Sequence, residues 1–363
     1  MVEWKTIGDI SINVFAGGTP STKHEEYYDG DIPWIRSGEI DFNTITKAER
    51  NITQEGYDNS SAKLIRNGSV VMAMTGATVA KSAIVDFETS ANQSVCAIET
   101  DESIANYRYV YFYLAKDYFK IKSSAQGALT SLNLAMIKQI NIPIPPMAEQ
   151  ERIVGILDTF TASIDNLKAQ IEQRRKQYEH YRDQLLDLEG KEGVEMKIEE
   201  FCLLKAGKSV SADEISEDYN ENYYPCIGGN GIRGYVPFYS HEGEYPIIGR
   251  QGALCGCVNW VTGKFYATEH AVVASGNNDI NQRFLFYLFE NADLNQYKTQ
   301  GAQPGLSVAK LNEIKFRIPS LQEQERIVGI LDTFEASIAN LEAQLEQRQK
   351  QYEYYREKLL TFE

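Results

Sequence analysis

The stretch EQERIVGILDTF occupies residues 149–160, and the same twelve letters return at residues 323–334. Around these two stretches, residues 149–189 align with residues 323–363 without a gap, and 31 of the 41 aligned positions are identical. The similarity fades upstream of each copy but does not vanish. The chain is therefore a duplicated unit, in which a variable domain alternates with a near-identical segment.

Each near-identical segment has the pattern of one long helix. Apolar or aromatic side chains recur at alternating steps of four and three residues through five heptads, and no proline interrupts either run. A strict repeat of this kind predicts a coiled-coil seam rather than the broad apolar face of a globular helix. The matched seam positions that we single out are Ile153, Leu157, Phe160 and Arg174 in the first copy and Ile327, Leu331, Phe334 and Arg348 in the second.

Two arrangements of these helices fit the pattern. In the first, the two helices of one chain pack antiparallel, which relates the halves by a pseudo-twofold axis and puts the variable domains at opposite ends. In the second, the helices of two chains form an intermolecular coiled coil. We predict the first arrangement. Arg174 and Arg348 would then be polar seam residues that fix the register, unless their guanidinium groups extend to solvent.

The variable parts of the chain mix strands and helices. The runs SVVMAMTG and EYPIIGR are typical of strands that end in glycine turns, and NYRYVYFYLAKDYFK and NQRFLFYLFENA are typical of buried aromatic helices. The predicted fold class is α+β, with two globular α/β domains at residues 1–148 and 190–322. Two long antiparallel helices, at residues 149–189 and 323–363, separate these domains.

Composition limits the classes of protein to which the chain can belong. The net charge is −15, and none of the four segments is basic overall, which argues against a sequence-independent nucleic-acid binder. The apolar runs are too short to cross a bilayer, and the N-terminal residues lack the pattern of a signal peptide. Five cysteines, an odd number, argue against a disulfide framework. We therefore expect a cytoplasmic protein without membrane contact.

No constellation of residues predicts an active site or a metal site. GNGIRG at residues 229–234 has the spacing of a dinucleotide-binding fingerprint, but no helix pattern follows it, so a glycine turn is the better interpretation. AGKS at residues 206–209 lacks the first glycine of a phosphate-binding loop. Cys255 and Cys257 have no second pair at zinc spacing. His270 follows Glu269, but the first half has no matching dyad.

Polar side chains beside glycine turns are the best candidates for contacts with DNA. Arginine can bond guanine, and asparagine or glutamine can bond adenine, through paired hydrogen bonds in the major groove, whereas lysine can hold phosphates. Thr75 is a turn residue first and a DNA contact second. For each lone lysine, a solvated surface position is the alternative. The candidates are Arg36, Ser37, Thr75 and Lys81 in the first half and Asn230, Arg233, Arg250, Gln251 and Lys264 in the second.

The chain resembles the specificity (S) subunit of type I restriction–modification systems. The resemblance is carried by WKTIGDI, IPWIRSGEI, VVMAMTGATVAKSAIV and INIPIPPMAEQERIVGILDTF, the last of which has the counterpart IKFRIPSLQEQERIVGILDTF. It covers essentially the whole chain. Its specific part is a Pro-x-x-x-x-Gln-x-x-Ile pattern that leads into a long helix and occurs twice.

The resemblance implies a non-catalytic subunit that reads double-stranded DNA. Each variable domain would be a target recognition domain for one half of a split, asymmetric site. The two helices would set the distance between the halves and dock two methyltransferase (M) subunits. S-adenosylmethionine and ATP would be bound by the M and restriction (R) subunits, and this chain would bind no cofactor. The main alternative is a coiled-coil scaffold that joins two protein-binding domains without nucleic acid; an enzyme is a more distant one.

Overall fold

The chain forms two compact units. The computed structural model describes residues 2–125, 131–252, 255–299 and 305–362. Unit 1 contains Met1–Leu167 and Gln344–Glu363, and Unit 2 contains Lys168–Ala343. Each unit therefore combines one variable domain with a part of each long helix, and the division between the units falls within the helices.

The two long helices are α5, Met147–Leu186, and α9, Leu321–Leu359. Neither contains a proline after its first turn, so the hydrogen-bond ladder of each can run for ten turns or so. Helix α5 ends before Leu188, which lies within the segment predicted as helical. Gly190, whose φ is +71°, turns the chain there, and the Leu188 side chain is buried in the core of Unit 2.

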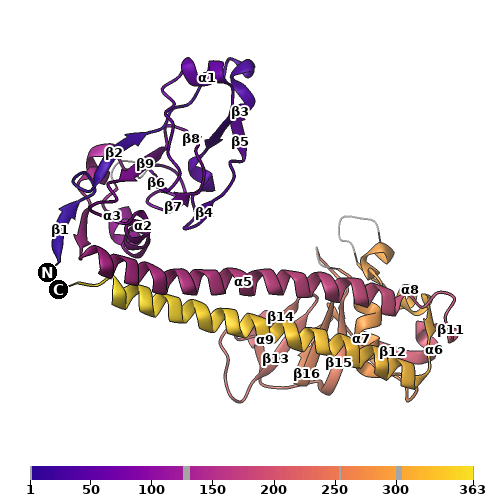
Figure 1. The fold of residues 1–363 in the computed structure, drawn as a ribbon. Helices are drawn as coiled ribbons and strands as arrows, with labels where there is room; N and C mark the ends of the chain where they lie inside the picture. Colours follow the sequence, from indigo (N-terminus) through magenta and orange to yellow (C-terminus); the bar gives the residue numbers. More distant parts are fainter. Residues whose placement is uncertain (1, 126–130, 253–254, 300–304, 363) are drawn as a thin grey trace. The chain divides into compact units, whose positions relative to one another are not determined.

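The sheets of Unit 1 are built mostly from short strands (Figure 1). A five-stranded sheet has the order β2-β9-β6-β7-β4, a three-stranded sheet has the order β5-β3-β8, and β1 pairs with β10. The strands are β1 (Glu3–Thr6), β2 (Ser11–Ala16), β3 (Tyr28–Ile35), β4 (Thr44–Ile45), β5 (Arg50–Ile52), β6 (Ser69–Ala73), β7 (Ser82–Val85), β8 (Ser90–Ala91), β9 (Val95–Thr100) and β10 (Asn141–Ile144).

Helix α2, Tyr107–Lys116, joins this sheet to the long helix. Asn106 caps it, because its side-chain oxygen accepts hydrogen bonds from the backbone N–H groups of Arg108 and Tyr109. One side of α2 contacts β6 and β7, and Arg108 reaches α5. The aromatic run predicted as a buried helix is therefore the layer between sheet and long helix. The shorter helices of Unit 1 are α1 (Gln54–Asp58), α3 (Tyr118–Ser123) and α4 (Leu134–Lys138).

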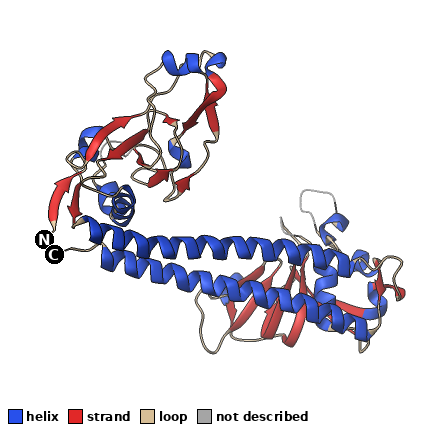
Figure 2. Cartoon of the chain, in the orientation of Figure 1, coloured by secondary structure: helices blue, strands red, loops and turns tan. Residues whose placement is uncertain are grey.

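Unit 2 repeats this plan with longer strands. Figure 2 shows its strands as one layer beside the helices, and the six-stranded sheet has the order β12-β17-β15-β16-β13-β14, with β11 paired to β18. The strands are β11 (Val194–Lys197), β12 (Cys202–Ala206), β13 (Tyr224–Gly228), β14 (Gly231–Val236), β15 (His241–Gly249), β16 (Val258–Ala267), β17 (Ala271–Gly276) and β18 (Lys315–Ile318). Its shorter helices are α6 (Ile198–Phe201), α7 (Gln282–Asn291) and α8 (Val308–Asn312).

Helix α7 is the counterpart of α2. Asn281 caps it by accepting from the N–H groups of Arg283 and Phe284, as Asn106 does in Unit 1. Helix α7 contacts β15 and β16, and Arg283 reaches Asp332 of α9. The capping residue, the sheet contact and the arginine link are thus the same in both units.

Within each unit, the two long-helix segments meet through aromatic rings. In Unit 2, Tyr181 stacks on Phe334 at 5.4 Å between centroids, and Arg175 pairs with Glu342. The α5 residue number falls as the α9 number rises, so the two segments run in opposite directions. In Unit 1, Phe160 stacks on Tyr355 at 5.2 Å, and the end of α9 lies beside the beginning of α5 (Figure 1).

Candidate nucleic-acid interface

Four of the five candidates in Unit 2 lie on adjoining turns. Asn230 is exposed in the turn between β13 and β14, and Arg233 is exposed on β14. Arg250 and Gln251 follow β15 directly. The two turns are pressed together at their glycines, because a β-carbon on Gly249 would lie only 2.0 Å from the carbonyl oxygen of Gly229. The sequence prediction of a glycine turn at GNGIRG is therefore correct.

The backbone of Arg250 ties this group to two further segments. Its N–H donates to the carbonyl of His270 at 3.0 Å, and its carbonyl accepts from the N–H of Leu306 at 2.8 Å. Residues 268–270, which connect β16 to β17, therefore lie beside the candidate turns. Burial raises the pKa of Cys226, while Arg233 lowers it and Glu269 raises it, so both charged groups act on this thiol. The sequence analysis had set Glu269 and His270 aside.

Lys264 makes its contacts elsewhere. It lies on β16 opposite Glu242 of β15, and its ammonium group is 4.7 Å from the centroid of the Tyr239 ring and 3.9 Å from the Glu242 carboxylate. An exposed pair of this kind contributes little stability. The structure brings Asn230, Arg233, Arg250 and Gln251 together but leaves Lys264 outside that group.

The four candidates of Unit 1 also share two adjoining loops. Arg36 and Ser37 follow β3, and Thr75 and Lys81 lie in the loop between β6 and β7. The loops are linked by Thr78, whose hydroxyl donates to the carbonyl of Ser37 at 2.8 Å. Sequence alone could not show this link, because the two segments are 41 residues apart.

Carboxylates neutralise the cations of this Unit 1 surface. The guanidinium of Arg36 donates to Glu49 at 2.5 Å and lies 3.7 Å from Glu39, and the ammonium of Lys81 lies 2.5 Å from Asp41. The side chains of Arg36, Glu49 and Asp41 are well exposed, so the Arg36–Glu49 and Lys81–Asp41 pairs are worth about 0–1 kcal/mol each. Either cation can therefore exchange its partner for another acceptor at small free-energy cost.

The two units hold different side chains on one backbone scaffold. In Unit 1, the N–H of Met74 donates to the carbonyl of Ser94, and its carbonyl accepts from Leu132. Arg250 makes the same pair of backbone bonds in Unit 2, with His270 and Leu306. Met74 thus corresponds to Arg250 and Ser94 to His270. The scaffold is conserved between the units, and the side chains it presents are not.

The helix residues predicted for the seam contact more than the opposite helix. Ile153 and Leu157 are fully buried in the core of Unit 1, together with residues of the variable domain. Ile327 and Leu331 are equally buried in the core of Unit 2. These four side chains therefore anchor each long helix to its own globular domain.

Phe160 and Phe334 have matching environments. Each stacks on a tyrosine of the other long helix, and each lies under a guanidinium: Arg348 is 5.7 Å from the Phe160 centroid and Arg174 is 5.8 Å from the Phe334 centroid. Both arginines are half-buried. Their guanidinium groups thus lie over aromatic rings, a geometry that is attractive by about 0.5–1 kcal/mol at exposed sites.

The glutamine of the repeated motif links each long helix to its variable domain through hydrogen bonds. Gln150 is 1% exposed; its side-chain oxygen accepts from the N–H of Asn106, and its amide nitrogen donates to the carbonyls of Ile104 and Pro145. Gln324 makes the same three bonds in Unit 2, with Asn281, Asp279 and Pro319. The Pro-x-x-x-x-Gln-x-x-Ile pattern is therefore a structural element that closes each unit.

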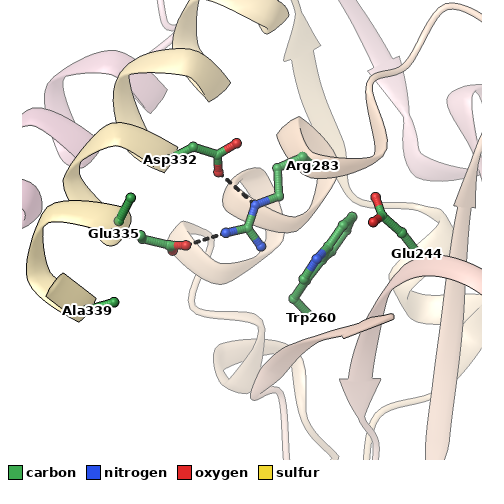
Figure 3. A pocket seen from close by; sticks show the side chains of 7 residues that line it. Glu244, Trp260, Arg283, Asp332, Glu335 and Ala339 are labelled. Carbon is green, nitrogen blue, oxygen red and sulfur yellow. Dashed lines mark hydrogen bonds and ion pairs between the residues drawn. The ribbon is translucent and has the colours of Figure 1, made fainter. Parts of the chain in front are cut away.

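A pocket in Unit 2 surrounds the link between α7 and α9 (Figure 3). Arg283 donates to Asp332 at 2.9 Å and to Glu335, and its guanidinium is 4.9 Å from the Trp260 centroid. Burial acts to lower the pKa of Arg283, but the bond to Asp332 and the nearby charges outweigh it, so the pKa lies above its ordinary value. The pocket is thus occupied by an internal ion pair that fastens domain to helix.

The described part of the chain holds neither a cluster of metal ligands nor a membrane-spanning helix. Within residues 2–125, 131–252, 255–299 and 305–362, no group of three or more His, Cys, Asp or Glu side chains is placed to hold a metal ion. Nor does any described helix have the length and apolarity needed to span a bilayer. The five cysteines are free thiols, and Cys257 alone among them is exposed.

Comparison with known proteins identifies the family. Residues 1–174 and 191–349 each match the family described as the type I restriction modification DNA specificity domain. The chain belongs to this family. The specificity subunit of the type I restriction enzyme EcoprrI of Escherichia coli is 38% identical over 359 residues, which cover 92% of this chain and 88% of that protein. The EcoR124I/EcoR124II specificity subunit of the same species is 34% identical over 53% of this chain and 50% of that protein.

Solved structures agree on the fold. The crystal structure of a type I system S subunit from M. genitalium superposes with a TM-score of 0.68 at 18% identity, covering 100% of this chain and 97% of that one. A specificity subunit from Thermoanaerobacter tengcongensis gives a TM-score of 0.52 at 16% identity, covering 99% and 96%. The chain is thus a mixed α/β type I specificity subunit with two specificity domains, as the sequence predicted.

Proposed function

We propose that the chain is the non-catalytic, sequence-reading subunit of a type I restriction–modification complex and that it recognises a split, asymmetric site in double-stranded DNA. The observation that carries this proposal is the scaffold shared by the two units. Ser94 and His270 accept the same backbone hydrogen bond, from Met74 and Arg250 respectively, but present a hydroxyl and an imidazole. Two such domains suit two different half-sites, because base choice depends on the side chains presented to the groove.

Four segments would divide the work. Residues 1–148 and 190–322 are the two target recognition domains, and residues 149–189 and 323–363 are the helical regions. The helical regions form an antiparallel coiled coil with pseudo-twofold symmetry. The exchanged pairs Phe160–Tyr355 and Phe334–Tyr181 support this symmetry, because each pair becomes the other when 174 is added to one residue number and subtracted from the other.

The helices would also dock two methyltransferase subunits. The first turns of α5 and α9 present the same exposed residue types, and these include Gly155 and Gly329, whose missing β-carbons face open space. An exposed helical glycine is about 1 kcal/mol less favourable than alanine, so its presence twice favours close approach by a partner. The matched exposed residues are Glu151, Arg152, Gly155, Thr159 and Ala162 and, in the second copy, Glu325, Arg326, Gly329, Thr333 and Ala336.

The partners would carry the chemistry. The M subunits would bind S-adenosylmethionine and methylate the DNA, the R subunits would use ATP, and this chain would bind neither cofactor. The complex would work in the cytoplasm, where its five free thiols stay reduced. Because the chain carries a net charge of −15, the M subunits would also supply much of the phosphate contact.

The recognised motif is the direct test of this function. The chain is co-expressed with its methyltransferase subunits, and the methylated sequence is read from genomic DNA of the host. We expect one motif with two defined halves and a fixed spacer. Arg250→Ala should change only the half read by Unit 2, and loss of both halves or of neither would contradict its assignment as a reader. A continuous motif without a spacer would contradict the proposed function itself.

The spacer tests the role of the helices. One heptad inserted into α5 between the two units should lengthen the recognised spacer or abolish assembly, while any half-site that is still read keeps its letters. A change in those letters would show that the helices do not act as the ruler.

Affinity tests the electrostatic part of the proposal. The isolated chain and the complex are titrated with the same duplex over a range of salt concentrations. The isolated chain should bind weakly at physiological salt, and the complex should bind much more tightly with a steep salt dependence. Nanomolar specific binding by the isolated chain would refute the division of phosphate contacts.

A further inference from the structure

Four polar side-chain atoms beside the Unit 2 turns are shielded from water and have no hydrogen-bond partner among the residues that the structure describes. They are Nε of Arg250, Oγ1 of Thr268, Oε2 of Glu269 and Nδ1 of His270. Three of these residues can carry a charge. Buried polar groups in folded proteins nearly always have partners, so a cluster of four that lack them points to groups completed by something outside the chain.

The backbone holds these residues together. Thr268 donates its N–H to the carbonyl of Ile227 at the end of β13, and Arg250 donates its N–H to His270. The ring of His270 lies beside Glu269, with Nε2 3.3 Å from Oε1, so it orients that carboxylate. More than a third of the side chains of Glu269 and His270 is exposed, so the cluster is open to a ligand at its outer edge.

The corresponding residues of Unit 1 do not share this feature. Asn92, Gln93 and Ser94 occupy the positions of Thr268, Glu269 and His270. The side-chain oxygen of Asn92 accepts from the N–H of Ser94 at 3.2 Å, and that of Gln93 accepts from the hydroxyl of Thr19. The unpaired groups at residues 268–270 therefore belong to the side chains of Unit 2, whereas the unpaired atom in the candidate loops of Unit 1 is Nε of Arg36.

We propose that Arg250 and Glu269, with His270 as a positioning residue, read a G·C base pair in the half-site recognised by Unit 2. This inference rests on the proposed function. The guanidinium of an arginine donates to O6 and N7 of guanine, and a carboxylate accepts from the N4 amino group of cytosine. One cation and one carboxylate on neighbouring turns thus match the major-groove groups of the two bases in a single G·C pair. The base edges would give partners to Nε of Arg250 and Oε2 of Glu269, two of the four atoms that lack one in the free chain.

Glu269→Gln and Arg250→Lys test the assignment within the assembled methyltransferase complex. Glutamine keeps the size of Glu269 but offers its own donor to the cytosine amino group. Lysine keeps the charge of Arg250 but loses the fork that bonds guanine, so phosphate binding would survive and base reading would not. Methylation rates are measured on a duplex library in which each base pair of both half-sites is varied.

We expect both variants to lose discrimination at the same G·C pair of the Unit 2 half-site, by about ten- to a hundredfold. Discrimination in the other half-site should stay as in the unchanged complex, which also shows that the variant chain is folded. Glu244→Gln is the matched control: it makes the same carboxylate-to-amide change on β15, outside the cluster, and should leave both half-sites unchanged.

Three results would overturn the inference without touching the proposed function. The Unit 2 half-site would contain no G·C pair; or the variants would relax different positions or the other half-site; or their discrimination would equal that of Glu244→Gln. If the unchanged complex recognised no split site at all, the proposed function would fail, and this inference with it.

Discussion

Gln150→Glu is the substitution that most directly tests how each helix is fastened to its domain. The change replaces an NH2 group by an oxygen and keeps the shape of the side chain. The bond accepted from the N–H of Asn106 survives. The two bonds donated to the carbonyls of Ile104 and Pro145, at 3.1 and 2.9 Å, become contacts between acceptors.

The magnitude follows from those two bonds. Leaving a buried acceptor unpaired costs about 1–3 kcal/mol, so the ionised variant should lose roughly 2–6 kcal/mol of unfolding free energy in Unit 1. A protonated carboxyl can donate one bond again, so the folded state raises the pKa of the new group above its unfolded value of about 4.3. The loss of unfolding free energy is then fully present when the pH is above the pKa of the new carboxyl in the folded state. The loss shrinks as the pH falls toward the pKa of that carboxyl in the unfolded state.

Hydrogen exchange followed by mass spectrometry, combined with urea unfolding, measures the effect in each unit. Protection of α2 should fall strongly in Gln150→Glu at pH 7 and recover in part near pH 4–5, whereas α7 should be less affected. Gln324→Glu should give the reverse pattern, because Gln324 makes the same three bonds in Unit 2. Gln150→Leu removes the polar group, and its deficit should not depend on pH. A loss below about 1 kcal/mol at pH 7, or no difference in pH dependence between Glu and Leu, would refute the reasoning.

Three further predictions concern the helices and the thiols. A double-mutant cycle on Phe160 and Tyr355, measured by urea unfolding, should give a coupling energy of about 0.5–1.5 kcal/mol, and an additive result would show that the stacked pair adds nothing. Gly155→Ala should stabilise α5 by up to about 1 kcal/mol because open space surrounds the new methyl group, yet it should weaken methyltransferase binding in a pull-down titration; unchanged binding would contradict docking at this face. Iodoacetamide at neutral pH should label exposed Cys257 first, because burial raises the pKa of Cys96 and of Cys202 to about 12; early labelling of either buried thiol in a peptide map would contradict this order.

The long helices could be predicted from the sequence because their pattern is periodic and local. The heptad spacing placed α5 and α9 within a few residues of their observed ends. The spacing could not show what the apolar residues pack against. Ile153 and Leu157 are buried in the domain core, because the variable domain folds back onto the first turns of the helix. A periodic pattern reports that a face is buried and does not report by which neighbour.

The function of the repeated glutamine could not be derived from the pattern either. Gln150 bonds Ile104 and Asn106, which precede it by more than 40 residues, and no local signal links such distant groups. The loop candidates were predicted for a different reason, since arginine and amide side chains beside glycines have a plausible chemistry wherever they occur. Arg250 and Gln251 were predicted in this way, and their role in reading DNA stays a prediction.

Glu269 and His270 were not among the candidates predicted from the sequence, because they were weighed only as a catalytic pair. An alignment of the two halves indicates recognition residues better than residue type alone, because His270 is aligned with Ser94 of the first half. A polar or charged residue that replaces a small one on a shared scaffold is free to serve recognition. Whether such a charged group has a hydrogen-bond partner inside the chain depends on three-dimensional packing, which could not be predicted from the sequence.

The duplication separates the groups that maintain the fold from the groups that would read DNA. The fold of each unit depends on backbone hydrogen bonds at the loop residues and on the hydrogen bonds of the buried helix glutamine. Both sets of bonds are the same in the two halves. Met74 and Arg250 show the consequence, because a methionine and an arginine satisfy the same two backbone bonds. A substitution at this position leaves those two backbone bonds in place, but the Met74 side chain also packs in the buried core of Unit 1. Side chains at the exposed loop positions can therefore differ between the units without changing the backbone bonds of the scaffold or the helices on which the partner subunits would dock.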